Sequence, residues 1–329
     1  AKSITLGSDG GNIELNPRDE SQTSGFVNWH HDNGTTEYLS NDNPIGIISN
    51  DSSLTIKGTL GFLDNASLYS SSGDVSIENL NLENGNIRVW GGSLNLGGGS
   101  VGADGRLLIP GSASLVLQEK EEPWTLTING GDLGLVPPAT LDLAGNQINF
   151  TGGKLDLGGA RSLDNINTDA NTALNVIGFL EISRTDGGQS NIGDLGFYGS
   201  AQSLNVSGMS LSISGSVVLD NKYISNIGGN LDFKNAPALN NSSSISLTNG
   251  DLVLQDGINA AENSSINLTA SNLKPKGLIS LGNGSINLDG ASSIVLQGET
   301  TFSKDGSLYL TTLSLNGNTF SLGSNVTDL

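Results

Sequence analysis

The stretch that decides the fold runs from Ile245 to Leu322 and reads ISLTNGDLVLQDGINAAENSSINLTASNLKPKGLISLGNGSINLDGASSIVLQGETTFSKDGSLYLTTLSLNGNTFSL. Triplets with apolar first and third residues recur through it. They are Ile245-Ser246-Leu247, Leu252-Val253-Leu254, Ile266-Asn267-Leu268, Ile279-Ser280-Leu281, Ile286-Asn287-Leu288, Ile294-Val295-Leu296, Leu308-Tyr309-Leu310 and Phe320-Ser321-Leu322. An apolar residue at every second position is the pattern of a strand with one buried face, so each triplet predicts one short strand whose middle residue points to solvent.

The spacing of the triplets is regular. Their first residues fall into three columns: Ile245, Ile266, Ile286 and Leu308; Leu252, Leu273 and Ile294; and Ile258, Ile279, Phe302 and Phe320. Neighbours within a column are usually about 21 residues apart, and consecutive triplets are about seven apart. A chain that returns to the same side once per turn is typical of a solenoid with stacked parallel strands. The sequence therefore predicts an all-β, single-stranded parallel β-helix with three sides and about 21 residues per coil, and its seven-residue sides favour the right-handed form.

The same rhythm extends back to Leu54, which predicts one solenoid domain over residues 54–329. The rhythm loosens near residues 161–203, where we expect a longer loop to leave a corner of the coil. Residues 1–53 are predicted to form a first coil or cap with an aromatic-rich excursion, because the open end of a β-helix exposes unpaired strand edges that must be covered.

Composition limits the function. The chain has 329 residues with 46 Gly, no Cys and a formal net charge of −19. Glycine supplies the backbone conformations that tight corners need, and the absence of Cys excludes disulfides and thiolate chemistry. The negative charge argues against nucleic acid as a partner, since phosphates attract Lys and Arg. No apolar run reaches membrane-spanning length, so direct membrane insertion is not expected.

Two segments carry a resemblance to a known group of proteins. Residues 139–159 read ATLDLAGNQINFTGGKLDLGG and residues 283–290 read NGSINLDG. They resemble the coils of secreted bacterial β-helix adhesins, including filamentous-haemagglutinin-like and autotransporter passenger proteins. The resemblance is one of repeat style and covers most of residues 54–329. It implies an exported, extracellular protein displayed at a cell surface, with a polysaccharide or a host or cell surface as its ligand, and it supplies no site residues.

Aromatic residues are the candidates for ligand contact, because an aromatic ring can stack under the apolar face of a sugar. Trp29 and Tyr38 lie in the N-terminal excursion, Trp90 follows an inward Val, and Trp124 lies in a polar corner. We predict these four residues as ligand-binding. The alternative for each ring is that it covers a loop or a corner, and a binding surface follows only if several share one face.

An enzyme is the first alternative, because lyases, hydrolases and tailspike-like proteins are also built on β-helices. Such enzymes need clustered carboxylates. Asp142 and Asp156 are 14 residues apart, which places them on different sides, and Glu181 and Asp232 are isolated. We therefore expect a non-catalytic protein without a cofactor, with residues 186–194 as a weak candidate for structural calcium.

A structural subunit that stacks end to end into a filament or surface layer is the second alternative. Only seven residues follow Leu322, which leaves little material for a polar cap at that end of the solenoid. Either the chain is a piece of a longer solenoid of a larger surface protein, which is the interpretation we favour, or its uncapped end exposes strand edges that another chain can pair with. The second interpretation predicts end-to-end self-association.

Overall fold

The structure, a computed structural model, describes residues 3–6, 13–15, 26–29, 46–49, 53–62, 67–70, 73–261, 263–282, 284–303, 307–309, 313–314 and 320–322. Every regular element within these ranges is a β-strand, and the strands pair in parallel. No helix able to span a membrane is found in this part of the chain. The all-β parallel solenoid predicted from the triplets is confirmed, and its strands form two compact units.

Unit 1 comprises residues 1–157 and 165–167. Its strands form three ladders, and the long strands β5, β7 and β9 bend through more than one of them. The first ladder is β1 (Ser3–Leu6), β5 (Ser53–Phe62), β7 (Val75–Val89), β8 (Ser93–Leu96), β10 (Ser114–Leu117) and β13 (Thr140–Asp142). The second is β2 (Ile13–Leu15), β5, β7, β9 (Gly99–Ile109), β11 (Thr125–Asn129), β14 (Gln147–Thr151) and β16 (Ile166–Asn167). The third is β3 (Phe26–Trp29), β4 (Gly46–Ser49), β6 (Ser67–Ser70), β7, β9, β12 (Asp132–Leu135) and β15 (Lys154–Ser162).

Unit 2 comprises residues 158–164 and 168–329, and its three ladders are regular. Ladder A is β17 (Ala173–Ser183), β19 (Leu195–Ser207), β22 (Tyr223–Ile227), β25 (Ser244–Thr248), β28 (Ser265–Thr269), β31 (Ser285–Asp289) and β34 (Ser307–Tyr309). Ladder B is β18 (Gln189–Ile192), β20 (Ser210–Ile213), β23 (Leu231–Phe233), β26 (Asp251–Leu254), β29 (Asn272–Pro275), β32 (Ser293–Val295) and β35 (Leu313–Ser314). Ladder C is β21 (Val218–Asp220), β24 (Ala238–Asn240), β27 (Ile258–Ala260), β30 (Gly277–Ser280), β33 (Thr300–Ser303) and β36 (Phe320–Leu322).

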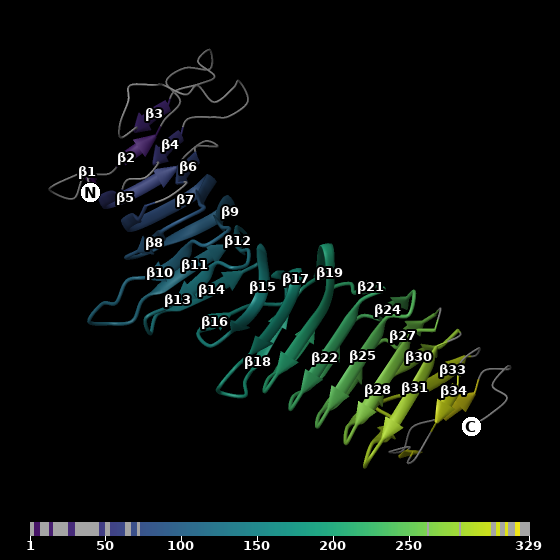
Figure 1. Cartoon of the computed structure of the whole chain (residues 1–329). Coiled ribbons are helices and arrows are strands. Elements are labelled where there is room, and N and C mark those ends of the chain that lie inside the picture. The colour runs from purple at the N-terminus through teal and green to yellow at the C-terminus, as the bar shows by residue number, and fades with distance from the viewer. Residues whose placement is uncertain are drawn as a thin grey trace. The chain divides into compact units, whose positions relative to one another are not determined.

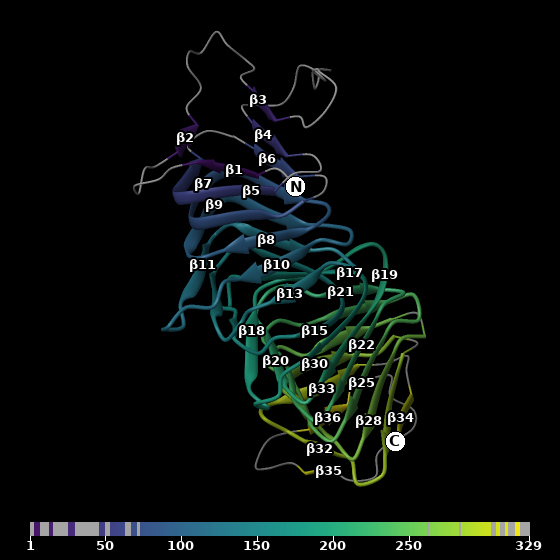
Figure 2. The same ribbon diagram turned by 60° about the vertical axis from the view of Figure 1, so that its left-hand side comes forward.

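Figure 1 shows β22, β25, β28 and β31 of ladder A as a row of parallel arrows in green to yellow, and Figure 2 brings β30, β33 and β36 of ladder C into view.

In ladder A the predicted column matches the observed register. Ile245 pairs with Ile266 and Ile266 with Ile286 in ladder A, each step about one 21-residue coil. Ile245 and Leu247 are buried at 0% and 1% exposure, whereas Ser246 between them is half-buried. The apolar columns therefore stack into a thin core along the inside of the coil, as alternation requires.

One predicted register is wrong. Phe302 pairs with Leu322, and Phe320 pairs with Thr300, so the last triplet of ladder C is shifted by two residues from the predicted column. A shift of two keeps the same side chains inward, which is why periodicity alone could not detect it.

The corner between ladders A and B depends on glycine. A Cβ on Gly250 would lie 1.9 Å from the carbonyl oxygen of Gly229, and a Cβ on Gly229 would lie 1.8 Å from that of Met209. Successive coils approach so closely here that only a residue without a side chain fits.

The two irregular regions of the sequence contribute strands. Within residues 1–53 the described segments are β1 to β4, which pair into the ladders of unit 1. Within residues 161–203 the irregularity is a bulge: Ile177 pairs with Tyr198 but Phe179 pairs with Ser203, so β19 carries four residues between the paired positions where β17 carries one. Gly178 and Gly199 adopt positive φ at this bulge.

Candidate functional site

The outer face of ladder A in unit 2 is the most distinctive described surface. Three exposed large apolar side chains lie on this face: Phe179 (47% exposed), Tyr223 (41%) and Ile227 (57%). Each is outward because it flanks or alternates with a buried residue such as Leu180. Exposed apolar groups that gather on one face mark a contact surface more often than scattered ones do.

The two aromatic rings share one column of the register. Phe179 pairs with Ser203, and Ser203 pairs with Tyr223, so the rings are two strands apart with a small side chain between them. At the strand spacing of a β-sheet this separation is about 9.6 Å. Because Ser203 has a small side chain, no large side chain stands between the two rings in this column.

A polar column runs beside the rings. Its members, one per strand from β17 to β31, are Glu181, Asn205, Ser225, Ser246, Asn267 and Asn287. Several are joined along the column: the Ser225 hydroxyl donates to Asn205 Oδ1 at 2.7 Å, and Asn287 Nδ2 donates to Asn267 Oδ1 at 2.8 Å. Hydroxyl and amide groups held in this way present both donors and acceptors at fixed positions.

Of the four predicted ligand residues, Trp90 and Trp124 lie at different corners of unit 1. Trp90 is 43% exposed and lies at the corner between the third and first ladders of unit 1, where its backbone N–H donates to Ser70. Trp29 is the last residue of β3 and pairs with Ser49, which pairs with Ser70. Ser70 pairs with Val89, the residue before Trp90, so Trp29 and Trp90 differ by one position in the register. Tyr38 lies outside the described residues.

Trp124 lies at a different corner of unit 1, between the first and second ladders, and its contacts are internal. Its indole N–H donates to the Gln118 carbonyl at 3.0 Å, and the Lys120 ammonium lies 5.7 Å from its ring centroid. Its backbone N–H donates to Asn146 Oδ1 at 3.0 Å, and the buried Asn146 also donates to the Leu143 carbonyl. These contacts close the excursion of residues 118–124, so they favour the alternative that Trp124 holds a corner.

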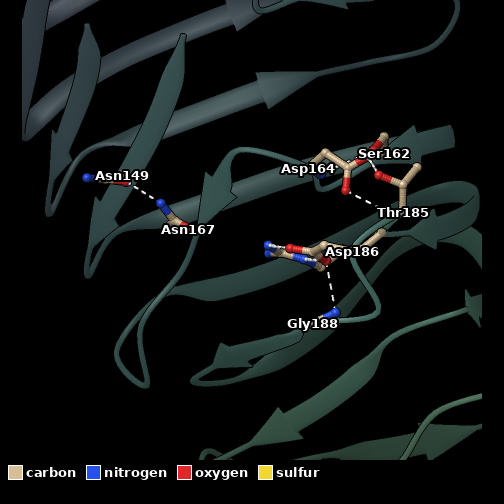
Figure 3. A network of polar contacts seen from close by, with 8 residues as sticks. Asn149, Ser162, Asp164, Asn167, Thr185, Asp186 and Gly188 are labelled. Atoms are coloured by element: carbon tan, nitrogen blue, oxygen red, sulfur yellow. Dashed lines mark hydrogen bonds and ion pairs between the residues drawn. The ribbon is translucent and has the colours of Figure 1, made fainter. Parts of the chain in front are cut away.

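In the loop considered for calcium, residues 186–194, the carboxylate of Asp186 accepts its hydrogen bonds from other groups of the chain (Figure 3). Arg184 donates from both Nε and Nη2 to the two carboxylate oxygens of Asp186, at 2.9 and 2.8 Å, and the Gly188 N–H also donates to Asp186. The Arg184 guanidinium therefore holds the pKa of Asp186 well below its usual range. Asp194 lies at the other end of β18 and accepts from the Ser216 N–H at 2.8 Å. Both carboxylates of this loop thus accept hydrogen bonds from other groups of the chain.

Asp164 is held in the same way (Figure 3). It accepts from the Thr185 N–H at 2.8 Å, the Thr185 hydroxyl at 2.9 Å and the Ser162 hydroxyl at 2.8 Å. The bond from the Thr185 N–H is the main cause that lowers the pKa of Asp164. In unit 1 the amide of Asn167 donates to Asn149 Oδ1 at 2.7 Å, which repeats the polar pairing of ladder A.

The four carboxylates that were considered for catalysis lie on four different ladders. Asp142 lies on the first ladder of unit 1 and Asp156 on the third, so the prediction that they lie on different sides is confirmed. Asp232 lies on ladder B and Glu181 on ladder A. In the described part of the chain no three His, Cys, Asp or Glu side chains are grouped so that they could hold a metal ion.

Sequence reasoning missed Phe179 and Tyr223. Each directly precedes an apolar residue of a triplet-like pattern, Leu180-Glu181-Ile182 and Ile224-Ser225-Asn226, so alternation alone would have placed both outward. What hid their relation was the bulge in β19, because of which Phe179 and Tyr223 share one register column, two strands apart, although they are separated by 44 residues.

The chain matches no family model, no curated protein and no solved structure.

Proposed function

We propose that this protein is a non-catalytic glycan-binding β-solenoid that works as an adhesin, and that the outer face of ladder A in unit 2 contacts the ligand. The observation that carries the proposal is the column in which Phe179 and Tyr223 flank the small Ser203 beside a continuous row of hydroxyl and amide side chains.

The chemistry of this face suits carbohydrate. The faces of pyranose rings are partly apolar and stack on aromatic rings, while their hydroxyls need both donors and acceptors. Phe179 and Tyr223 offer the first kind of contact, and Asn205 and Ser225 offer the second.

The proposal is non-catalytic because hydrolysis or elimination at a glycosidic bond needs an acid and a base close together. On the face itself, Glu181 is the carboxylate beside the rings, and the next one along its columns is Asp289 on β31, five strands away. An extracellular, cell-surface location belongs to the same proposal. It is supported by the resemblance in repeat style.

The test is a pull-down on insoluble cellulose, chitin and xylan with the wild-type protein and a Phe179→Ala/Tyr223→Ala variant. We expect the variant to bind roughly thirtyfold less tightly, because each of the two rings contributes close to 1 kcal/mol beyond the area that it buries. The matched control is Trp90→Ala/Trp124→Ala, which removes two rings elsewhere and should leave binding unchanged.

A reducing-sugar assay runs on the same samples. Retention of binding by Phe179→Ala/Tyr223→Ala would contradict the proposed face, and its loss in the control variant would support the rings first predicted from the sequence. Released sugar would show that the protein is an enzyme. No binding to any polymer would overturn the glycan proposal.

A further inference from the structure

The charge of the ladder A face differs from that of the chain as a whole. The chain carries a net charge of −19. Over the six strands from β17 to β31, the three outward columns contain two charged side chains, Glu181 on the first strand and Asp289 on the last. The positions between them are occupied by Ser, Asn, Thr, Tyr and Ile, and no Lys or Arg is among them. A face without cationic side chains on an acidic protein does not attract an anionic polymer. The face is therefore electrostatically suited to an uncharged polymer.

The face also has a repeat along the solenoid axis. Each strand adds one side chain to the polar column, so donors and acceptors recur about every 4.8 Å. One pyranose unit of an extended 1,4-linked glycan has nearly the same length. The rings of Phe179 and Tyr223, two strands apart, then coincide with every second sugar. A glycan that crossed the strands in the other direction would meet no such repeat.

We infer that the ligand is a neutral, extended polysaccharide that lies parallel to the solenoid axis, with about one sugar per strand. Two of its sugar rings stack on the side chains of Phe179 and Tyr223. This inference rests on the proposed function and adds the charge class and the orientation of the ligand. The polar column from β17 to β31, which is the track that the ligand would follow, is about 24 Å long. A five-residue strand is about 13 Å long, and this length sets the width of the face. The length of the track fits roughly five or six sugars, and the width fits two or three.

Titration calorimetry with soluble xylo- and cello-oligosaccharides of two to eight sugars tests the orientation. Axial binding predicts that affinity increases with length to about six sugars and then levels off, with a gain of roughly tenfold or more between three and six. Affinity that already levels off at three sugars would overturn the axial orientation while the proposed glycan binding stood. No heat with any neutral oligosaccharide, in a protein that also fails the pull-down, would overturn both.

An Asn267→Ala/Thr269→Ala variant tests the part of the polar column beyond the rings, on β28, which is two strands from Tyr223 and four strands from Phe179. It should weaken hexasaccharide binding several-fold and leave trisaccharide binding unchanged, because the short ligand stays at the rings. The matched control, Asn259→Ala on ladder C, should affect neither. Equal loss for both lengths, or none for either, would contradict axial binding.

The charge class is tested with oligogalacturonides of six units as the anionic probe, at low and high salt. We expect no binding at low salt, and we expect the affinity for the neutral hexasaccharide to change less than twofold between the two conditions. Tighter binding of the anionic probe would overturn the assignment to neutral glycans.

Discussion

At the scale of single residues, the corners of this protein are held by side chains that bond the backbone of a neighbouring coil. Asp164 and Thr185 belong to successive coils, and the carboxylate of Asp164 accepts both donors of Thr185. Such bonds matter because a corner has fewer backbone pairs than a strand, so its polar groups need side-chain partners.

Asp164→Asn should lower the apparent Tm by a few degrees at pH 7. An amide nitrogen cannot accept the bonds that the carboxylate accepts. The pKa of Asp164 is below its ordinary 3.8 in the folded protein, so its contribution to stability is fully present above about pH 4 and is lost as pH falls through the lower folded pKa.

Thermal melts of both proteins from pH 7 to pH 2 check this expectation. The difference in Tm should be constant down to about pH 4 and shrink below it. Asp256→Asn, at an exposed turn of the same unit, serves as the control. A difference that grew on acidification would contradict the assigned role.

At the scale of elements, the inward columns of ladder A carry the stability. Ile224, Ile245 and Ile266 stack in successive strands with 1%, 0% and 0% exposure. A parallel strand in a solenoid packs only on its neighbours, so a gap in one column cannot be filled from elsewhere.

Ile245→Ala should reduce the free energy of unfolding by about 3 kcal/mol, since it deletes a fully buried side chain and leaves a cavity. Ser246→Ala, at the adjacent outward position, should change it by less than about 0.5 kcal/mol. Urea unfolding followed by circular dichroism measures both. Equal effects of the two substitutions would contradict the assignment of inward and outward positions.

Trp124 links the two ends of the excursion of residues 118–124, because its indole N–H donates to the Gln118 carbonyl. Trp124→Ala removes the indole bond to Gln118 and the ring beneath Lys120, so cleavage by trypsin after Lys120 should become several-fold faster. Glycan binding should stay unchanged. Lost glycan binding with unchanged cleavage would show instead that Trp124 contacts the ligand, as the sequence first suggested.

At the scale of the whole molecule, end-to-end self-association stays a prediction from the sequence, and so does the right-handed winding. Sedimentation velocity over a hundredfold range of concentration tests association. End-to-end stacking predicts a sedimentation coefficient that rises with concentration without a preferred size, because a head-to-tail contact does not close. A monomer at every concentration would contradict it.

The sequence by itself determined the fold. Residues such as Ile245, Ser246 and Ile266 show the triplets, the spacing of about 21 residues and the alternation of inward and outward positions. Each strand of a solenoid pairs with the strand one coil away, so the repeat length identifies the partner of each residue. The same reasoning placed Asp142 and Asp156 on different sides.

Only the tertiary structure decided where the exposed rings meet. Alternation tells which way Phe179 and Tyr223 point, but it does not tell that they share a column, because the bulge in β19 breaks the period between them. It likewise could not tell that Trp124 turns its indole N–H to the backbone of Gln118, since that contact depends on the path of an irregular corner. Regular coils are determined by local repetition, and the site depends on the places where the repetition stops.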